Sequence, residues 1–185
     1  DDQPRLLGQS LDLQSIFQAN VSVANGTYGN LILSRWAVGS THRISLKRGI
    51  RKARGAQLVH VETPEGVVHL VNTHLGLDEK ERHWQVEFLL AHKLFQSSAA
   101  IPTLIAGDFN DWRDTLAERS LASHGFQQVT SPPAEFRSFP SWLPVGSLDK
   151  VFIRGSVKTE RVRVVRTSLA RVASDHLPIV VEFSL

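Results

Sequence analysis

Residues 101–112 read IPTLIAGDFNDW, an apolar run typical of a buried strand that ends abruptly in polar residues. Asp108 and Asn110 stand two positions apart, so on an extended chain both side chains point to the same side. Together they offer a charged acceptor and a neutral hydrogen-bond donor, which chemistry on a phosphate group requires. This stretch predicts a strand that delivers polar ligands to a site at its end.

Polar, ionisable residues also flank three other apolar runs. In layered α/β folds, ligands gather where strands give way to loops at one edge of a sheet. We therefore expect these strand ends to converge with residues 107–110. The three segments are Asn72-Thr-His74-Leu, Ser147-Leu-Asp149-Lys and Ser174-Asp175-His176-Leu-Pro178.

The rest of the pattern predicts strands alternating with helices, a layered α/β architecture. Asn25-Gly26 is a strong hairpin signal, and Asp78 with Glu81 forms a capping-box pattern that opens a helix of about 18 residues. The apolar positions of that helix are Trp84, Phe88, Ala91 and Phe95. Further helices are expected near 1–8 and 114–124, and strands near 43–50, 56–63, 67–75, 101–107, 126–130, 147–154, 160–166 and 178–185.

Length and composition favour one globular domain spanning residues 1–185, with 42% hydrophobic residues to form its core. The absence of cysteine excludes disulfides, thiolate metal ligands and a cysteine nucleophile. No apolar run reaches the roughly 18–20 residues that span a bilayer, and no secretory signal opens the chain. These features predict a soluble protein without a transmembrane segment, placed in the cytoplasm.

The charge pattern leaves two interpretations open. The formal net charge is +3, which favours approach to nucleic acid or an acidic lipid surface, or else reflects a solvated surface with a few extra arginines. One basic cluster lies between two expected strands and is either a functional patch or a flexible hairpin. It consists of Lys47, Arg48, Arg51, Lys52 and Arg54.

If the four strand ends meet, their side chains support a scheme for hydrolysis. His176 would act as general base on water, with Asp149 or Asp108 holding its other ring nitrogen. His74 would contact phosphoryl oxygens, and Asp175 or Asp108 would help to hold a divalent ion, for which Mg²⁺ suits the oxygen ligands. We assign His42, His60, His69, His83, His92 and His124 to structural roles.

Five motifs in this order resemble the endonuclease/exonuclease/phosphatase superfamily, and they cover the chain from about residue 28 to its end. The segment 136–144 resembles the short bacterial members and lacks the Trp-Cys-Asp-Arg segment of inositol phosphatases. The motifs are Gly29-Asn-Leu-Ile-Leu-Ser-Arg35, Asn72-Thr-His74-Leu75, Gly107-Asp108-Phe-Asn110, Leu148-Asp149-Lys-Val and Ser174-Asp175-His176-Leu-Pro178.

The resemblance implies a DNase I-like four-layered α/β (α+β) sandwich of two packed mixed sheets flanked by helices, and metal-dependent cleavage of phosphoester bonds with Mg²⁺ or Mn²⁺. It implies that His74 and His176 are the paired catalytic histidines. Asp149 would orient His176, and Asp108 with Asn110 would place water and phosphate. Asp108 and Asp175 would lie at the metal, and Asn30 would be a neutral hydrogen-bond partner of the first histidine.

The chain departs from the family pattern at its beginning. The family's first strand with a metal-facing Asn, and a later strand ending in a Gln-Glu pair, have no counterpart before Asp1 or Asp2. We therefore expect an N-terminally incomplete domain, whose missing strands come from an upstream piece or from another copy.

The leading hypothesis is a metal-dependent phosphodiesterase of nuclease type, with nucleic acid favoured over phospholipid as substrate. The alternatives are a sphingomyelinase-like phospholipase and a catalytically silent binding member. Four aromatic residues near the expected rim would stack on a base, pack on a lipid or simply pack in their loops. They are Trp112, Phe136, Phe139 and Trp142.

Overall fold

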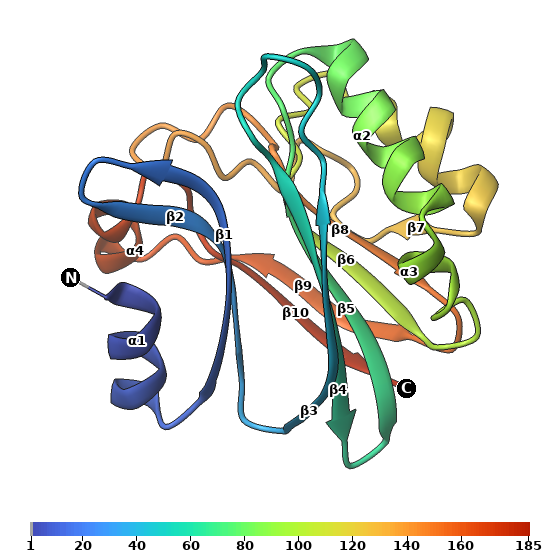
Figure 1. The fold of residues 1–185 in the computed structure, drawn as a ribbon. Coiled ribbons are helices and arrows are strands. Elements are labelled where there is room, and N and C mark those ends of the chain that lie inside the picture. The colour runs from blue at the N-terminus through green and yellow to red at the C-terminus, as the bar shows by residue number, and fades with distance from the viewer. Residues whose placement is uncertain (1) are drawn as a thin grey trace.

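The computed structural model describes residues 2–185, and its centre is a six-stranded mixed sheet in the order β3-β4-β5-β6-β8-β7 (Figure 1). Strands β5 and β6 run parallel, and every other neighbouring pair in this sheet is antiparallel. The strands are β3 (Ala37–Ser45), β4 (Gly55–Thr63), β5 (Gly66–His74), β6 (Thr103–Asp108), β7 (Gln127–Gln128) and β8 (Asp149–Arg154).

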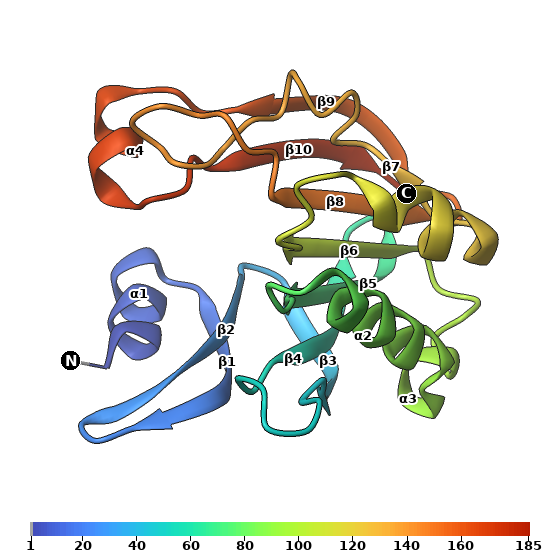
Figure 2. The ribbon, with the colours of Figure 1, turned by 90° about the horizontal axis from the view of Figure 1, so that it is seen from above.

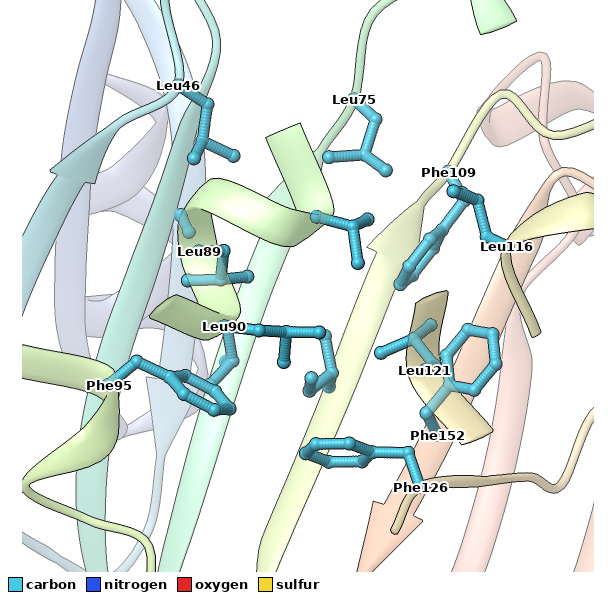
Figure 3. Close-up of a cluster of buried hydrophobic side chains, with 14 of the residues drawn as sticks. Leu46, Leu75, Leu89, Leu90, Phe95, Phe109, Leu116, Leu121, Phe126 and Phe152 are labelled. Atoms are coloured by element: carbon cyan, nitrogen blue, oxygen red, sulfur yellow. The ribbon is translucent and has the colours of Figure 1, made fainter. Parts of the chain in front are cut away.

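Helices cover one face of this sheet and bury the larger of two apolar clusters. Helix α2 (Glu79–Ala91), the short α3 (Lys93–Gln96) and the irregular turns η1 (Ala117–Leu121) and η2 (Ala122–His124) form this layer. Figure 3 shows Leu89 and Leu90 of α2 directed toward the sheet, with Phe95, Phe126 and Phe152 beside them. Because these side chains interlock across the sheet, the layer fixes the strand ends that follow it.

Two separate hairpins lie on the other face of the sheet. One pairs β1 (Gln14–Val23) with β2 (Gly26–Ser34), and the other pairs β9 (Lys158–Val164) with β10 (Ile179–Ser184). Figure 2 shows the two pairs set apart from each other, and each is a two-stranded sheet of its own. Side chains from both hairpins pack on the second apolar cluster, which includes Val59, Val68 and Leu104.

The expected α/β sandwich of packed sheets and helices is confirmed. The expected hairpin between β1 and β2 also forms, but its turn is at Ala24-Asn25, one position before Asn25-Gly26, because Gly26 pairs with Val23 as the first residue of β2. Helix α1 (Gln3–Leu11) has Asp2 as its N-cap and ends at Leu11, three residues later than the expected end at Gly8, with the left-handed Asp12 as its C-cap. The alternative cap Asp1 lies outside the described residues. No helix among residues 2–185 has the length and apolar character needed to cross a membrane.

The helix after Asp78 differs from the prediction in length and in its buried face. Asp78 does cap it, but α2 has 13 residues because the chain turns extended at His92 before α3 begins. Glu81 does not close a capping box, since its carboxylate pairs with Arg51 and accepts from Gln85. Trp84 and Phe88 stack on each other outside the main cluster, which α2 fills with Val86, Leu89 and Leu90 instead.

Other boundaries moved because tertiary pairing, and not local propensity, ends a strand. The expected strand at 43–50 begins earlier, at Ala37, and residues 46–54 form a loop. The strand at 126–130 shrinks to β7, and the helix at 114–124 contains a π-helical turn. The sequence reading missed α4 (Ser168–Ala173), a helix of only six residues with Thr167 as its cap.

Candidate active site

Three of the predicted site residues are cross-strand neighbours at one edge of the six-stranded sheet. His74 ends β5 opposite Asp108, which ends β6, and Asp108 lies opposite Asp149, the first residue of β8. Gly107 permits this close pairing, because a Cβ there would fall 1.8 Å from the carbonyl oxygen of Thr73 and its φ is +145°. The register therefore brings an imidazole and two carboxylates into one row.

A fourth predicted residue, His176, joins the row from the chain after α4. Its Nδ1 lies 2.7 Å from Oδ2 of Asp149, so the ring donates that N–H and leaves Nε2 without a hydrogen-bond partner in residues 2–185. The bond from Asp149 raises the pKa of His176 above its usual value, and burial opposes the rise. Asp149 thus holds the imidazole in one orientation and one tautomer.

Two residues of the loop before β8 support this pair: Ser138, which the sequence did not single out, and Phe139, which was predicted only as one of four aromatic residues near the rim. The hydroxyl of Ser138, fully buried, donates to the same Oδ2 of Asp149 at 2.5 Å. The ring of Phe139 packs on His176 with centroids 4.7 Å apart. The only signal in the sequence was their place in the aromatic segment 136–142, because neither residue type is ionisable.

His74 sits close to Asp108, yet the two do not form an ion pair at neutral pH. Their nearest atoms, Nε2 and Oδ2, are 3.4 Å apart. Burial lowers the pKa of His74 to about 4, with further lowering by Arg54, His176 and Lys52. The imidazole is therefore neutral near pH 7, and it offers one N–H donor and one nitrogen acceptor for hydrogen bonds.

Asp108 and Asn110 form the turn that the opening stretch predicted. Oδ1 of Asp108 accepts the backbone N–H of Asn110 at 2.9 Å, and Asn110 adopts a left-handed φ of 51°, which asparagine tolerates. Burial raises the pKa of Asp108. The Nδ2 of Asn110 donates one N–H to the carbonyl of Leu75, which fixes the buried side chain beside the end of β5.

Asp111, the second carboxylate of this segment, takes no place in the row. It is buried and lies 3.7 Å from the guanidinium of Arg82, and it accepts the backbone N–H of Leu116. These contacts anchor the loop that follows β6. Asp111 is thus structural, although it stands only three positions after Asp108.

Arg54 supplies a positive charge beside the row. It is only 8% exposed, and its guanidinium makes no hydrogen bond or ion pair with any residue between 2 and 185. Its charge lowers the pKa of His74, which places it near that imidazole. The buried atom is Nε, and a buried polar atom without a hydrogen-bond partner costs free energy. Lys52, on the same loop, lies over the ring of Tyr28.

The remaining predicted residues stand at the margin. Asp175 is exposed, accepts only from Ser174 by its side chain, and lies next to His176 in the chain. Asn30 is buried and makes no hydrogen bond to His74. Its amide bridges strands by donating to the carbonyls of Gly55 and Asn72. Any support that Asn30 gives to His74 is therefore indirect, through the placement of β5.

The predicted divalent metal site is not complete in this part of the chain. Within residues 2–185, no three histidine or acidic side chains converge in a way that could hold an ion. Asp149 is engaged by His176 and Ser138, and Asp108 faces His74. The donors among residues 2–185 therefore do not form a metal site by themselves.

Comparison with known proteins identifies the family to which the chain belongs. The profile of the Endonuclease/Exonuclease/phosphatase family matches residues 2–176. The chain belongs to this family. Members of the family are phosphoric ester hydrolases and generally use divalent metals.

Among curated relatives, the uncharacterized protein YbhP of Escherichia coli strain K12 is 28% identical over 173 residues, which are 90% of this chain and 66% of YbhP. The chain thus spans just under two thirds of that relative's length.

Solved structures of family members share the fold. A mannosyl-6-phosphatase from Bacteroides thetaiotaomicron superposes with a TM-score of 0.78 at 17% identity, over 99% of this chain and 81% of the other. TDP2 of D. rerio, complexed with a single-strand DNA product, gives a TM-score of 0.71 at 16% identity, over 98% of this chain and 80% of the other. These likenesses establish the DNase I-like sandwich.

Proposed function

We propose that this family member hydrolyses phosphodiester bonds, with His176 as general base. The observation that carries the proposal is the bond between Nδ1 of His176 and Asp149, which leaves Nε2 free at the same sheet edge as His74 and Asp108. An imidazole held by a carboxylate in this way is suited to remove a proton from water. The proposal agrees with the phosphoric ester hydrolase chemistry of the family.

In the proposed step, Nε2 of His176 accepts a proton from water while its oxygen attacks phosphorus. The bond from phosphorus to the leaving oxygen breaks, and that oxygen takes up a proton from solvent. Asp149 stabilises the imidazolium that forms, since its carboxylate already accepts the Nδ1 proton. His74, neutral at pH 7, and the second N–H of the Asn110 Nδ2 would donate to phosphoryl oxygens and orient the ester.

Arg54 would bind the phosphodiester's negative charge. Its Nε is buried without a hydrogen-bond partner among residues 2–185, and a phosphate oxygen would provide an acceptor for the guanidinium. The exposed cations of the same loop, Lys47 and Arg48 among them, would attract the rest of a polyanion. This distribution favours nucleic acid as substrate, and a neighbour bound to single-strand DNA product supports the same class.

The dependence on a divalent ion is part of the proposal. A bound Mg²⁺ would neutralise charge on the phosphoryl oxygens, and Mg²⁺ commonly uses one or two carboxylates with waters and substrate oxygens. Asp108 and Asp175 are the candidate ligands in this chain. Further ligands would have to come from outside residues 2–185 or from the substrate.

A second candidate is a catalytically silent binding member, favoured by the lack of a complete metal-binding group within the described residues. One assay separates the candidates. Full-length protein is incubated with a model phosphodiester, plasmid and abasic DNA, and sphingomyelin, with Mg²⁺ and with chelator. Cleavage of the model diester and DNA that chelator abolishes supports the proposal. Cleavage of sphingomyelin alone identifies a phospholipase, and binding without cleavage identifies the silent member.

A further inference from the structure

Five large apolar side chains project from two segments beside the candidate active site. Soluble surfaces seldom gather so many, and such gatherings mark places that contact another apolar body. We call this group the rim patch. It consists of Trp142 at 72% exposure, Leu143 and Val145 at 55%, Leu169 at 75% and Val172 at 82%.

The two segments are bound together, so the rim patch is a single surface. The guanidinium of Arg171 in α4 donates to the carbonyls of Ser141 and Trp142 at 3.1 and 3.3 Å. The hydroxyl of Ser141 donates back to the carbonyl of Arg171. Figure 2 shows α4 alongside the loop that precedes β8. These bonds hold the apolar residues of loop and helix in fixed relation.

The rim patch adjoins the row of predicted catalytic residues. The backbone N–H of Ser141 donates to the carbonyl of Asp175 at 2.7 Å, and Asp175 precedes His176. On the other side of the same loop, Phe139 packs against the His176 ring. Whatever covers the rim patch therefore lies within reach of the candidate site.

Unpaired cations accompany the apolar side chains. Arg171 uses its guanidinium on backbone carbonyls, and Arg166 donates to the carbonyl of Arg137 at 3.2 Å. Arg137, Arg166 and Arg171 take part in no ion pair among residues 2–185, so their charges remain available to an anionic partner.

The chemistry of the rim patch selects among anionic partners. Nucleic-acid surfaces stack bases on aromatic rings, whereas four of these five residues are aliphatic and cannot stack. Trp142, Leu169 and Val172, each at least 72% exposed, stand away from the protein, as insertion into a fluid interface requires. Tryptophan suits the boundary between headgroups and acyl chains, and arginines suit the phosphates above it.

We propose that the rim patch docks the protein on an anionic phospholipid surface. Trp142, Leu143, Leu169 and Val172 enter the interface, and Arg137, Arg166 and Arg171 contact the headgroups. The candidate site is then held at the lipid surface. This inference concerns binding alone and stands whether or not the protein hydrolyses phosphodiesters.

The test is co-sedimentation of the full chain with vesicles of phosphatidylcholine, with and without added phosphatidylserine. The double variant Leu169→Gln/Val172→Gln removes aliphatic surface at two positions that are 75% and 82% exposed. The matched control is Leu7→Gln/Leu11→Gln on α1, where two leucines are 45% and 57% exposed. A single-strand oligonucleotide is measured in parallel with all three proteins, because nucleic acid is the competing polyanion.

We expect binding to the phosphatidylserine vesicles, weakened by salt, and about a tenfold or greater loss in the α4 double variant with little change in the α1 control. Equal losses of vesicle binding in both double variants would overturn the proposal, because binding would then depend on exposed leucines in general and not on the rim patch. Failure of the natural protein to bind would overturn it as well. Loss of oligonucleotide binding with vesicle binding intact would show that the rim patch contacts nucleic acid instead.

Discussion

His176 and Asp149 are joined by a 2.7 Å hydrogen bond between Nδ1 and Oδ2, although 27 positions separate them in the chain. The bond gives His176 its orientation, and the proposed catalysis depends on it. Replacing His176 by Ala should lower the rate of phosphodiester cleavage by about 10²–10⁴-fold, the usual contribution of a general base. The control is His124→Ala, an exposed histidine far from the row in sequence. An unchanged rate in the His176 variant would eliminate the proposed role.

The pH dependence of cleavage should report the raised pKa of His176. The base acts only when neutral, so kcat/KM should rise with pH through the pKa of His176, which its bond to Asp149 places above the usual 6.5. In Ser138→Ala, Asp149 loses a second donor and attracts the imidazolium proton more strongly. The midpoint of the pH profile should therefore move upward. A midpoint that stays in place would mean that Ser138 does not position the pair.

Arg54 should contribute to substrate binding. Arg54→Met removes the unpaired guanidinium, and loss of one charge-assisted hydrogen bond, about 1.5–3 kcal/mol, should raise KM roughly 10–100-fold. Because the guanidinium also lowers the pKa of His74, the pKa should rise in the variant, as titration of the ring by NMR would measure. Lys47→Met, an exposed cation of the same loop, is the control. If KM rose equally in Arg54→Met and Lys47→Met, Arg54 would contribute only to the general electrostatic attraction of the substrate.

His69 should make the fold sensitive to acid. The ring is fully buried, its Nε2 has no hydrogen-bond partner, and burial lowers its pKa to about 3. The folded pKa lies below the unfolded value of 6.5, so protonation favours unfolding. Its contribution to stability is complete above pH 6.5 and is lost as the pH falls from 6.5 towards 3, a loss on the order of a few kcal/mol.

The check is urea denaturation at a series of pH values in the natural protein and in His69→Leu. The variant should show a flatter dependence of unfolding free energy on pH over that window, whatever its stability at pH 7. His124→Gln, at an exposed position, should retain the natural slope. If unfolding free energy depended on pH with the same slope in the His69 variant and the natural protein, groups other than His69 would cause the acid sensitivity.

The two hairpins on the second face of the sheet predict association of the 185-residue chain. They share no hydrogen bonds with each other, and an apolar cavity of about 260 Å³ lies between them, with Leu33, Val68, Leu70 and Phe183 among its walls. Open strand edges beside apolar surface recruit further strands. Light scattering should find oligomers, and the unfolding midpoint should rise with protein concentration. A stable monomer at all concentrations would contradict this.

Sequence alone placed the strands that carry the site because each motif stands where an apolar run meets a turn. Residues 107–110, His74 and Asp149 were predicted to converge for this reason, and the register of β5, β6 and β8 brings them together. Helix α4 escaped prediction because six residues carry too little periodicity to be recognised. The buried face of α2 was misassigned because aromatic residues at helical spacing also stack on a half-exposed surface.

The sequence determined the layered α/β class, the family and the residue types that meet at one sheet edge, because period, turn chemistry and motif order are local properties of the chain. The tertiary structure decided which of these residues have partners. Ser138 donates to Asp149, and the buried Nε of Arg54 has no hydrogen-bond partner among residues 2–185, because of how distant segments of the chain pack. The shifted pKa values of His74 and His176 follow from the same packing. Burial and pairing are properties of the assembled fold, so no local pattern encodes them.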